Sequence, residues 1–548
     1  MCYQPTTDPA SFNTNTDGYQ LPLPLRKLVC VYIPQTSKHR TRSNMVMNSQ
    51  ETLTHPLLLL LPFLFLVFTV YRRRKPALNL PPGPPPHPIF GNLKDLGENP
   101  HITFYHLSKK YGPLIHVNLG QIRTMFVCDA DTASEVLKAQ DQIFCSRAQL
   151  TSLKRFTYGG KDLAFCPFND HWKQLRRLCN TEVFSLGRVQ SFHSFRREEV
   201  DALINTISQT SARGETVNVS QMAFCYFNNL IFREVFGKRV SPEGECGWSP
   251  LQGLLREVVS SMSQLGTADL FPWFGWLDLL TGWQARLDKV YEKMDLVYEE
   301  KIREHMARIS EGKLDSDDFL DVLLHLLANE GSSLTMDQIK GLLMNMFTAG
   351  TDTSAVTMEM GMTRLIKNPE ALNKVQEEVR QVAGDKGLVE ESDLQHLPYL
   401  KQVIKETLRL HPPGPLLPPR ESMKDAKVNG YDIPAKTMIY VDVYSIGRDP
   451  KYWEDPEVFR PERFENSSVN FKGSNLEFIP FGAGRRLCPG IALAMANVEL
   501  AFANMLYRFN WTLPEGMTKE DVDLRPKPGL TTPKLIPLVL IATPAFTK

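Results

Sequence analysis

An apolar run near the beginning of the chain predicts its first element. Between Thr52 and Tyr71 no Asp, Glu, Lys or Arg occurs, and residues 57–70 are almost wholly Leu, Phe and Val. About twenty such residues are needed to span a bilayer. The basic cluster 72–75 follows at once, as in a stop-transfer sequence that stays cytoplasmic. A cleaved signal peptide fits less well, because no small-residue cleavage site precedes the cluster. We therefore predict a membrane anchor over residues 47–75.

The segments on either side of the anchor have biased compositions. Residues 1–46 are polar and aperiodic, which predicts a disordered extension. Their basic residues would compete for the cytoplasmic side, and translation from Met45 or Met47 instead of Met1 would remove them. N-terminal sequencing of the native protein distinguishes these starts. Residues 76–90 are rich in proline, which favours a stiff polyproline II spacer over a freely projecting SH3-type ligand.

Residues 91–548 have the pattern of one domain. Alternating and helical periodicities predict, in order, a helix over 101–111, strands over 114–119 and 124–128, and a helix over 131–139. Helical patterns dominate from 169 to about 384, and short strands return between 411 and 444 and near the C-terminus. The fold class is therefore mainly α with small β-sheets (α+β).

Charge and cysteine usage exclude several classes of protein. The net charge of the 548 residues is +1, whereas a nucleic-acid-binding protein would carry a basic footprint. The nine cysteines form no C-x-x-C pair, so the set fits a reducing compartment better than a disulfide framework or a zinc site.

A glycine-rich decapeptide holds the most informative cysteine. It runs from Phe481 to Gly490 and reads Phe-Gly-Ala-Gly-Arg-Arg-Leu-Cys-Pro-Gly. Glycines let the backbone approach a flat group closely, and a following helix stabilises the thiolate of Cys488. A buried free cysteine is the plainer alternative. The decapeptide, however, resembles the cytochrome P450 signature Phe-x-x-Gly-x-Arg-x-Cys-x-Gly at every fixed position. The resemblance implies that Cys488 is the axial ligand of heme b (iron protoporphyrin IX), with Phe481 and Arg486 at the cofactor.

A long helix carries the second motif. A capping box at Thr335 starts it, and it continues without proline to about Lys367. Residues 349–354, Ala-Gly-Thr-Asp-Thr-Ser, are a poor choice for a helix interior because Gly costs about 1 kcal/mol against Ala and hydroxyls bond back to carbonyls. They resemble the P450 oxygen-activation motif. The resemblance implies that Thr353 hydrogen-bonds at the dioxygen site and that Asp352 relays protons from solvent.

Three further patterns resemble P450 elements. Trp172 and Arg176 share a helix face. An amphipathic helix with Trp172 in the core and Arg176 in solvent would give the same pattern. The resemblance implies instead that both residues, together with Arg420, bind the heme propionates. The family's Glu-x-x-Arg pattern is matched by Glu406 and Arg409, and Arg463 would complete a buried structural triad.

The resemblance also implies a partner and a pocket. The expected docking site for NADPH–cytochrome P450 reductase is a basic face made by Lys173, Arg177 and Arg485, which would bind the reductase through complementary charge. The plainer alternative is that these side chains are simply solvated on the surface. The presumed substrate pocket would be apolar, suited to a lipophilic small molecule, and lined by Leu343, Phe347, Ala349, Leu416, Leu417 and Leu530.

Together these features are similar to plant microsomal cytochromes P450 of the seventy-one clan. We expect the P450 fold behind a single N-terminal transmembrane helix, in the endoplasmic reticulum membrane with the catalytic domain cytoplasmic. The expected activity is heme-thiolate monooxygenation, with O2 and NADPH-derived electrons, of a plant terpenoid, alkaloid or phenylpropanoid. The alternatives are an atypical oxidation on the same scaffold (ring formation, oxidative coupling or oxime dehydration) and a non-catalytic heme-binding protein.

Overall fold

The computed structural model describes residues 62–63, 78–239, 250–312, 318–329 and 334–546. The predicted extension lies outside these residues, as does the predicted anchor apart from Pro62 and Phe63. No helix within the described ranges is both long and apolar enough to cross a bilayer. The predicted boundaries after residues 46, 75 and 90 stay predictions.

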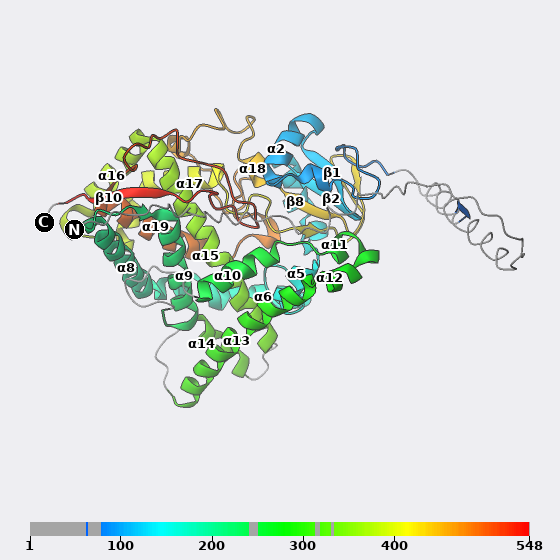
Figure 1. Ribbon diagram of the computed structural model, residues 1–548, viewed down its shortest axis with the longest axis horizontal. Coiled ribbons are helices and arrows are strands. Elements are labelled where there is room, and N and C mark those ends of the chain that lie inside the picture. The colour runs from blue at the N-terminus through cyan, green and yellow to red at the C-terminus, as the bar shows by residue number, and fades with distance from the viewer. Residues whose placement is uncertain (1–61, 64–77, 240–249, 313–317, 330–333, 547–548) are drawn as a thin grey trace, which may run out of the picture. The chain divides into compact units, whose positions relative to one another are not determined.

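Helices account for most of the described chain, as predicted. They are α2 (Pro100–Tyr111), α3 (Ala130–Ser134), α4 (Asp141–Phe144), α5 (Thr151–Phe156), α6 (Asp170–Leu178), α7 (Leu186–Ser191), α8 (His193–Ala212), α9 (Val219–Phe236), α10 (Pro250–Met262), α11 (Thr267–Leu270), α12 (Trp276–Leu280), α13 (Trp283–Ser310), α14 (Phe319–Ala328), α15 (Met336–Lys367), α16 (Pro369–Ala383), α17 (Pro398–Leu410), α18 (Val443–Ile446) and α19 (Ile491–Arg508). In Figure 1, α13 and α14 lie at one edge of the body that Leu78–Lys548 forms.

The strands are short. They are β1 (Leu114–Leu119), β2 (Ile122–Val127), β3 (Ser146–Arg147), β4 (Val217–Asn218), β5 (Arg420–Glu421), β6 (Ala426–Val428), β7 (Tyr431–Ile433), β8 (Met438–Val441), β9 (Phe509–Thr512) and β10 (Val539–Pro544). A five-stranded sheet has the order β1-β2-β8-β5-β3, with β2 and β8 parallel. The other sheets are β4-β10-β9 and β6-β7. The predicted pair of strands after α2 is the β1–β2 hairpin, in which Leu114 faces Val127.

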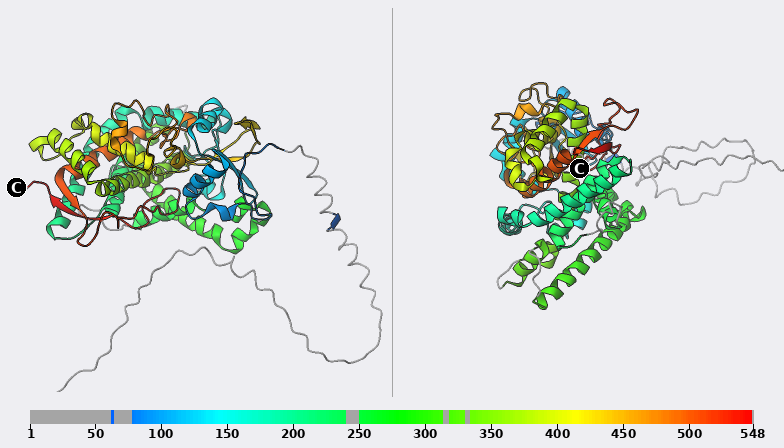
Figure 2. Two further views of the ribbon diagram at one scale, coloured as in Figure 1. Left: turned by 90° about the horizontal axis from the view of Figure 1, so that it is seen from above. Right: turned by 90° about the vertical axis from the view of Figure 1, so that its left-hand side faces the viewer.

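The long helix α15 runs through the body and organises the core. Its predicted capping box is present: the backbone N–H of Gln338 donates to Thr335 Oγ1, and the backbone N–H of Thr335 donates to Gln338 Oε1. Glycines let two neighbours approach it. A Cβ on Gly350 would lie 2.8 Å from Ile231 Cδ1 of α9, and one on Gly361 would lie 2.8 Å from the Phe502 ring of α19. Figure 2 shows the red strand β10 close to the C-terminus.

Candidate functional site

The cysteine loop is a tight hairpin that ends at the start of α19. The Cys488 N–H donates to Phe481 O at 3.0 Å. Gly482 and Gly484 have φ of 74° and 70°, in the left-handed region that favours glycine. A Cβ on Gly484 would also lie 2.2 Å from Leu137 O, so glycine is required there. The loop fixes the Cys488 sulfur one turn before Ile491, the first residue of α19.

Three kinds of groups act on the Cys488 thiol. Burial has the largest effect and raises the pKa of the thiol overall, whereas the backbone N–H of Gly490 and the positive charge of Arg176 lower it in part. Arg176 is held in place by donating to Leu487 O at 2.7 Å. An N–H group, a guanidinium and a helix N-terminus all stabilise a thiolate. The N–H group and the guanidinium thus offset part of the cost of burial, and they would favour the thiolate once the sulfur binds a metal ion.

The middle of α15 carries the predicted Asp352 and Thr353. The Thr353 hydroxyl donates to Ala349 O at 2.6 Å, which is the back-bonding expected of Thr inside a helix. Ala349 is exposed although the helix around it is largely buried. Asp352 accepts a hydrogen bond from Thr531 at 3.2 Å. Successive residues of a helix point in different directions, so the two side chains have different partners.

Three arginines are buried close together behind the cysteine loop. Arg147, Arg420 and Arg486 are 5%, 3% and 8% exposed, and Arg147 in β3 pairs with Arg420 in β5. Arg420 donates to the Asp141 carboxylate at 2.9 Å and to Ala483 O at 3.0 Å.

Arg486 and Arg147, by contrast, are bonded to main-chain carbonyls. Arg486 donates to the carbonyls of Cys145, Leu163 and Cys166 at 2.8, 3.2 and 2.6 Å. Arg147 donates to the carbonyls of Ala164, Pro418 and Pro419.

This donor set fits the predicted cofactor. Burial lowers the pKa of Arg486 to about 10, which reflects the cost of enclosing a cation. Carbonyls are neutral partners, and a planar guanidinium binds carboxylates more strongly. A heme group would match both the cysteine and the buried arginines. Its iron would bind the Cys488 sulfur, and its two propionates would bind the guanidiniums. Arg147 was not among the predicted residues, and its only sequence signal is its place in the apolar stretch 143–150.

The aromatic residues predicted at the cofactor support this set. The Trp172 indole donates to Leu163 O at 2.9 Å, and its ring lies 4.1 Å from the Arg486 guanidinium carbon. The Phe481 ring packs edge-on against Phe471. Trp172 and Phe481 therefore hold the arginine and the loop in position.

The predicted structural triad is present and buried. Arg409 donates twice to Glu406, at 2.7 and 2.8 Å, and Arg463 donates to Glu406 Oε1 at 2.9 Å. Both Glu406 and Arg409 have side chains that are 0% exposed. The guanidiniums also donate to carbonyls between residues 447 and 458. The network ties α17 to the chain that precedes the cysteine loop.

The predicted pocket residues divide into two groups. Ala349, Leu416, Leu417 and Leu530 are partly or fully exposed. Leu343 and Phe347 are not lining residues in this structure, since both are buried in the core, and this prediction is corrected. The Phe347 ring packs against Phe232 and Phe236 of α9. That side of α15 faces helices and not a cavity.

The predicted basic residues share one surface pocket of about 600 Å³. Lys173, Arg177 and Arg485 line it together with Arg176, and none of its lining residues is acidic. Arg485 is also paired with Asp141 at 3.0 Å. The pocket adjoins the cysteine loop, because Arg485 belongs to that loop and Arg176 contacts Leu487.

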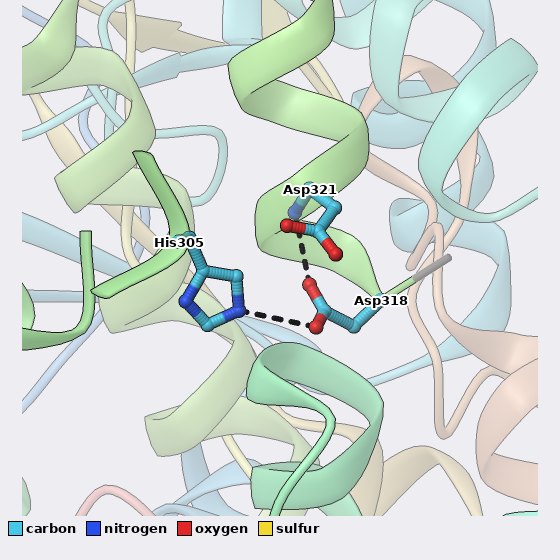
Figure 3. Close-up of side chains that lie close together, drawn as sticks. All are labelled: His305, Asp318 and Asp321. Atoms are coloured by element: carbon cyan, nitrogen blue, oxygen red, sulfur yellow. Dashed lines mark hydrogen bonds and ion pairs between the residues drawn. The ribbon is translucent and has the colours of Figure 1, made fainter. Parts of the chain in front are cut away.

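A second cluster of metal-ligating side chains lies between α13 and α14. Figure 3 shows His305, Asp318 and Asp321, whose ligand atoms lie within 4.8 Å of one another. The His305 Nε2 is 3.1 Å from Asp318, and its Nδ1 is 2.8 Å from Lys301 O. The Arg308 guanidinium lies 3.6 and 3.5 Å from the two carboxylates. The Arg308 cation thus already lies beside both acids, so we interpret the cluster as a structural ion network.

The chain is similar to known proteins over most of its length. The family model described as Cytochrome P450 matches residues 81–540. Cytochrome P450 71A1 of Persea americana is 45% identical over 82% of this chain and 91% of its own length. 5-Epiaristolochene 1,3-dihydroxylase of Nicotiana tabacum is 42% identical over 89% and 97%. Phenylacetaldehyde oxime monooxygenase CYP71AN24 of Prunus mume is 42% identical over 88% and 93%.

A solved structure shares the fold. A zebra fish cytochrome P450 determined with abiraterone has a TM-score of 0.68 and 26% sequence identity, and the alignment covers 82% of this chain and all of the other. The fold prediction is thereby confirmed for the helix-rich domain with its small sheets.

Proposed function

Because this chain belongs to the cytochrome P450 family and is a monooxygenase similar to plant members of family 71, we propose that it hydroxylates a lipophilic plant specialised metabolite. Candidate classes are terpenoids, alkaloids and phenylpropanoids. The observation that carries the proposal is the Cys488 loop, where the Gly490 N–H and Arg176 act on the sulfur and three buried arginines lie behind it. Similar proteins include a dihydroxylase of 5-epiaristolochene and a premnaspirodiene oxygenase.

The residues would divide the work as follows. Cys488 would hold the iron of heme b, and Arg147, Arg420 and Arg486 would bind its propionates together with Trp172 and Arg176. The bound heme supplies the iron chemistry that activates dioxygen. Thr353 and Asp352 would supply hydrogen bonds and protons from the chain. The net reaction is RH + O2 + NADPH + H⁺ → ROH + H2O + NADP⁺.

An atypical oxidation is the second candidate. The Prunus mume relative is named as an oxime monooxygenase and is as similar to this chain as the 5-epiaristolochene dihydroxylase is. Reaction under ¹⁸O2 separates the two, since a hydroxylation product gains one labelled oxygen atom whereas ring formation or oxime dehydration leaves the product unlabelled.

We propose NADPH–cytochrome P450 reductase as the electron donor. The support is the basic pocket of Lys173, Arg176, Arg177 and Arg485 beside the cysteine loop. An acidic partner would bind there with salt-dependent rates. The double variant Lys173→Glu/Arg177→Glu should slow reduction by the reductase while dithionite still reduces the heme. Unchanged reductase rates would contradict this docking site.

We also propose the endoplasmic reticulum membrane as the location, with the catalytic domain cytoplasmic. Besides the predicted anchor, an apolar patch supports it: Trp273, Phe274, Trp276, Leu279 and Leu280 are all half or more exposed. Such patches on a soluble surface mark contacts with proteins or membranes, and Trp is typical of membrane interfaces. Quenching of tryptophan fluorescence by brominated lipids in vesicles should weaken in Trp273→Ser/Trp276→Ser.

The decisive experiment uses the ferrous carbon monoxide complex. Thiolate ligation should give the long-wavelength Soret band of this family, and Cys488→Ala should abolish that band. Microsomes that carry the chain and reductase are then incubated with a panel of lipophilic metabolites, and products are read by mass spectrometry. Absence of the thiolate band from the purified protein would refute the heme-thiolate assignment.

A further inference from the structure

The acid of the α15 motif is held by a residue far away in the sequence. The Thr531 hydroxyl donates to Asp352 Oδ2 at 3.2 Å, and Thr531 is 8% exposed. Thr353, the neighbour of Asp352, uses its own hydroxyl on Ala349 O. The orientation of the Asp352 carboxyl group is therefore set from the C-terminal turn 529–531 and not from within the motif.

Two cations from other parts of the chain act on this carboxyl. Arg256 of α10 and Lys527 lower the pKa of Asp352 by their charge and Thr531 lowers it by its hydrogen bond, whereas burial, the largest influence, raises it. Glu359, two turns further along α15, shares the influence of Arg256. Arg256 itself lies 4.1 Å from the Phe224 ring of α9. Burial outweighs these groups, so the pKa of the Asp352 carboxyl is raised overall.

The turn that carries Thr531 also carries a candidate substrate contact. Leu530 is partly buried and precedes Thr531 directly. The Thr532 N–H donates to Pro413 O at 3.1 Å, which ties the turn to the segment that continues into Leu416. The Thr531 hydroxyl thus belongs to the same turn as Leu530, and this turn is tied to the segment of Leu416.

We propose that Thr531 is a positioning residue for Asp352, and that the turn 529–531 couples contact with the substrate at Leu530 to the orientation of the proton-relaying carboxyl. This inference rests on the proposed hydroxylation. Its chemical consequence is a choice between products of oxygen reduction. In the absence of substrate, O2 is reduced to water when protons are delivered: 2 NADPH + 2 H⁺ + O2 → 2 NADP⁺ + 2 H2O. When proton delivery fails, hydrogen peroxide is released: NADPH + H⁺ + O2 → NADP⁺ + H2O2.

The test uses the full chain with reductase, NADPH and O2, without an organic substrate. Thr531→Val removes the hydroxyl at nearly constant volume, and Thr531→Ser restores it. Thr532→Val is the matched control: it removes a neighbouring hydroxyl, whose bond to Pro413 O is long at 3.5 Å, and keeps the backbone bond to the same carbonyl. Thr531→Val should raise the ratio of H2O2 to water about threefold to tenfold, because a change of this size corresponds to the net contribution of one hydrogen bond. Thr531→Ser and Thr532→Val should stay near the wild-type ratio.

A second readout does not depend on turnover. The C=O stretch of the protonated Asp352 carboxyl is titrated by infrared difference spectroscopy and is identified by its loss in Asp352→Asn. Loss of a hydrogen bond to the charged form should move the titration midpoint in Thr531→Val to higher pH. If Thr531→Val does not fold, Thr531→Ala removes the same hydroxyl without added bulk.

The two proposals fail in different ways. If the wild type lacks the thiolate spectrum, the proposed function itself is refuted. If the spectrum is present and Asp352→Asn changes the H2O2 ratio, yet both hydroxyl-free variants keep the wild-type ratio and midpoint, the role of Thr531 alone is overturned.

Discussion

Removing the carboxylate of Glu406 should destabilise the catalytic domain more than almost any other single polar change. Glu406 accepts hydrogen bonds from Arg409, from Arg463 and from the backbone N–H of Arg460 at 2.9 Å. In Glu406→Gln the two guanidiniums keep their carbonyl partners but lose their only carboxylate in the triad. Breaking a buried ion pair costs about 3–5 kcal/mol. That is a large fraction of the roughly 5–15 kcal/mol by which most domains are stable.

The assay is the thermal half-life of the heme-loaded protein, followed through its ferrous carbon monoxide band. Glu215→Gln is the control, because its pair with Arg213 at 2.9 Å is exposed on both sides and such pairs contribute about 0–1 kcal/mol. Glu406→Gln should lose the band at temperatures where the control keeps it, or should fail to incorporate heme. A Glu406→Gln protein as stable as Glu215→Gln would refute the reasoning that the triad holds the loop.

Three further results are expected. Gly350→Ala should lower the thermal midpoint, because the new Cβ would lie 2.8 Å from Ile231 Cδ1. Overpacking costs about 1–3 kcal/mol, which exceeds the gain of about 1 kcal/mol from replacing Gly by Ala in a helix. Adding Ile231→Val should restore the midpoint, and an unchanged midpoint in the single variant would contradict the close packing. Burial raises the pKa of Glu234 from 4.5 to about 8, so the native state holds a proton that the unfolded state releases. The stability of the wild type relative to Glu234→Gln should therefore fall as pH rises from about 5 to 8, by up to about 1.4 kcal/mol per pH unit. Denaturant titrations measure this difference, and parallel pH curves for the two proteins would disprove it. Excess EDTA or zinc should leave the thermal midpoint unchanged, because Arg308 already pairs with both acids of the His305 cluster. A zinc-induced rise of the midpoint that His305→Gln abolishes would show a metal site instead.

The parts of the site that depend on local sequence could be predicted. The cysteine loop needs its glycines for the φ values of Gly482 and Gly484, and these appear in the sequence itself. The start of α15 follows from the capping box at Thr335, which joins residues three apart. The pair Glu406 and Arg409 is one helical turn apart on α17. Each of these is encoded within a few residues.

The parts that depend on distant contacts could not be predicted. Arg147 becomes part of the site because β3 pairs with β5, which no nearby residue indicates. The errors at Leu343 and Phe347 have another cause: α15 is buried on most of its surface, so apolar periodicity does not tell which side faces a pocket and which faces α9. The bond between Thr531 and Asp352 likewise joins the chain's last turns to its middle.

The enclosed guanidiniums of Arg147, Arg420 and Arg486 have a consequence for how the protein matures in a cell. Like charges held together without water oppose the final collapse of the chain. A dianionic ligand that binds the folded chain and not the unfolded one shifts that balance by mass action. Supply of the prosthetic group should then govern how much polypeptide escapes degradation, so cellular abundance would follow porphyrin synthesis as well as transcription.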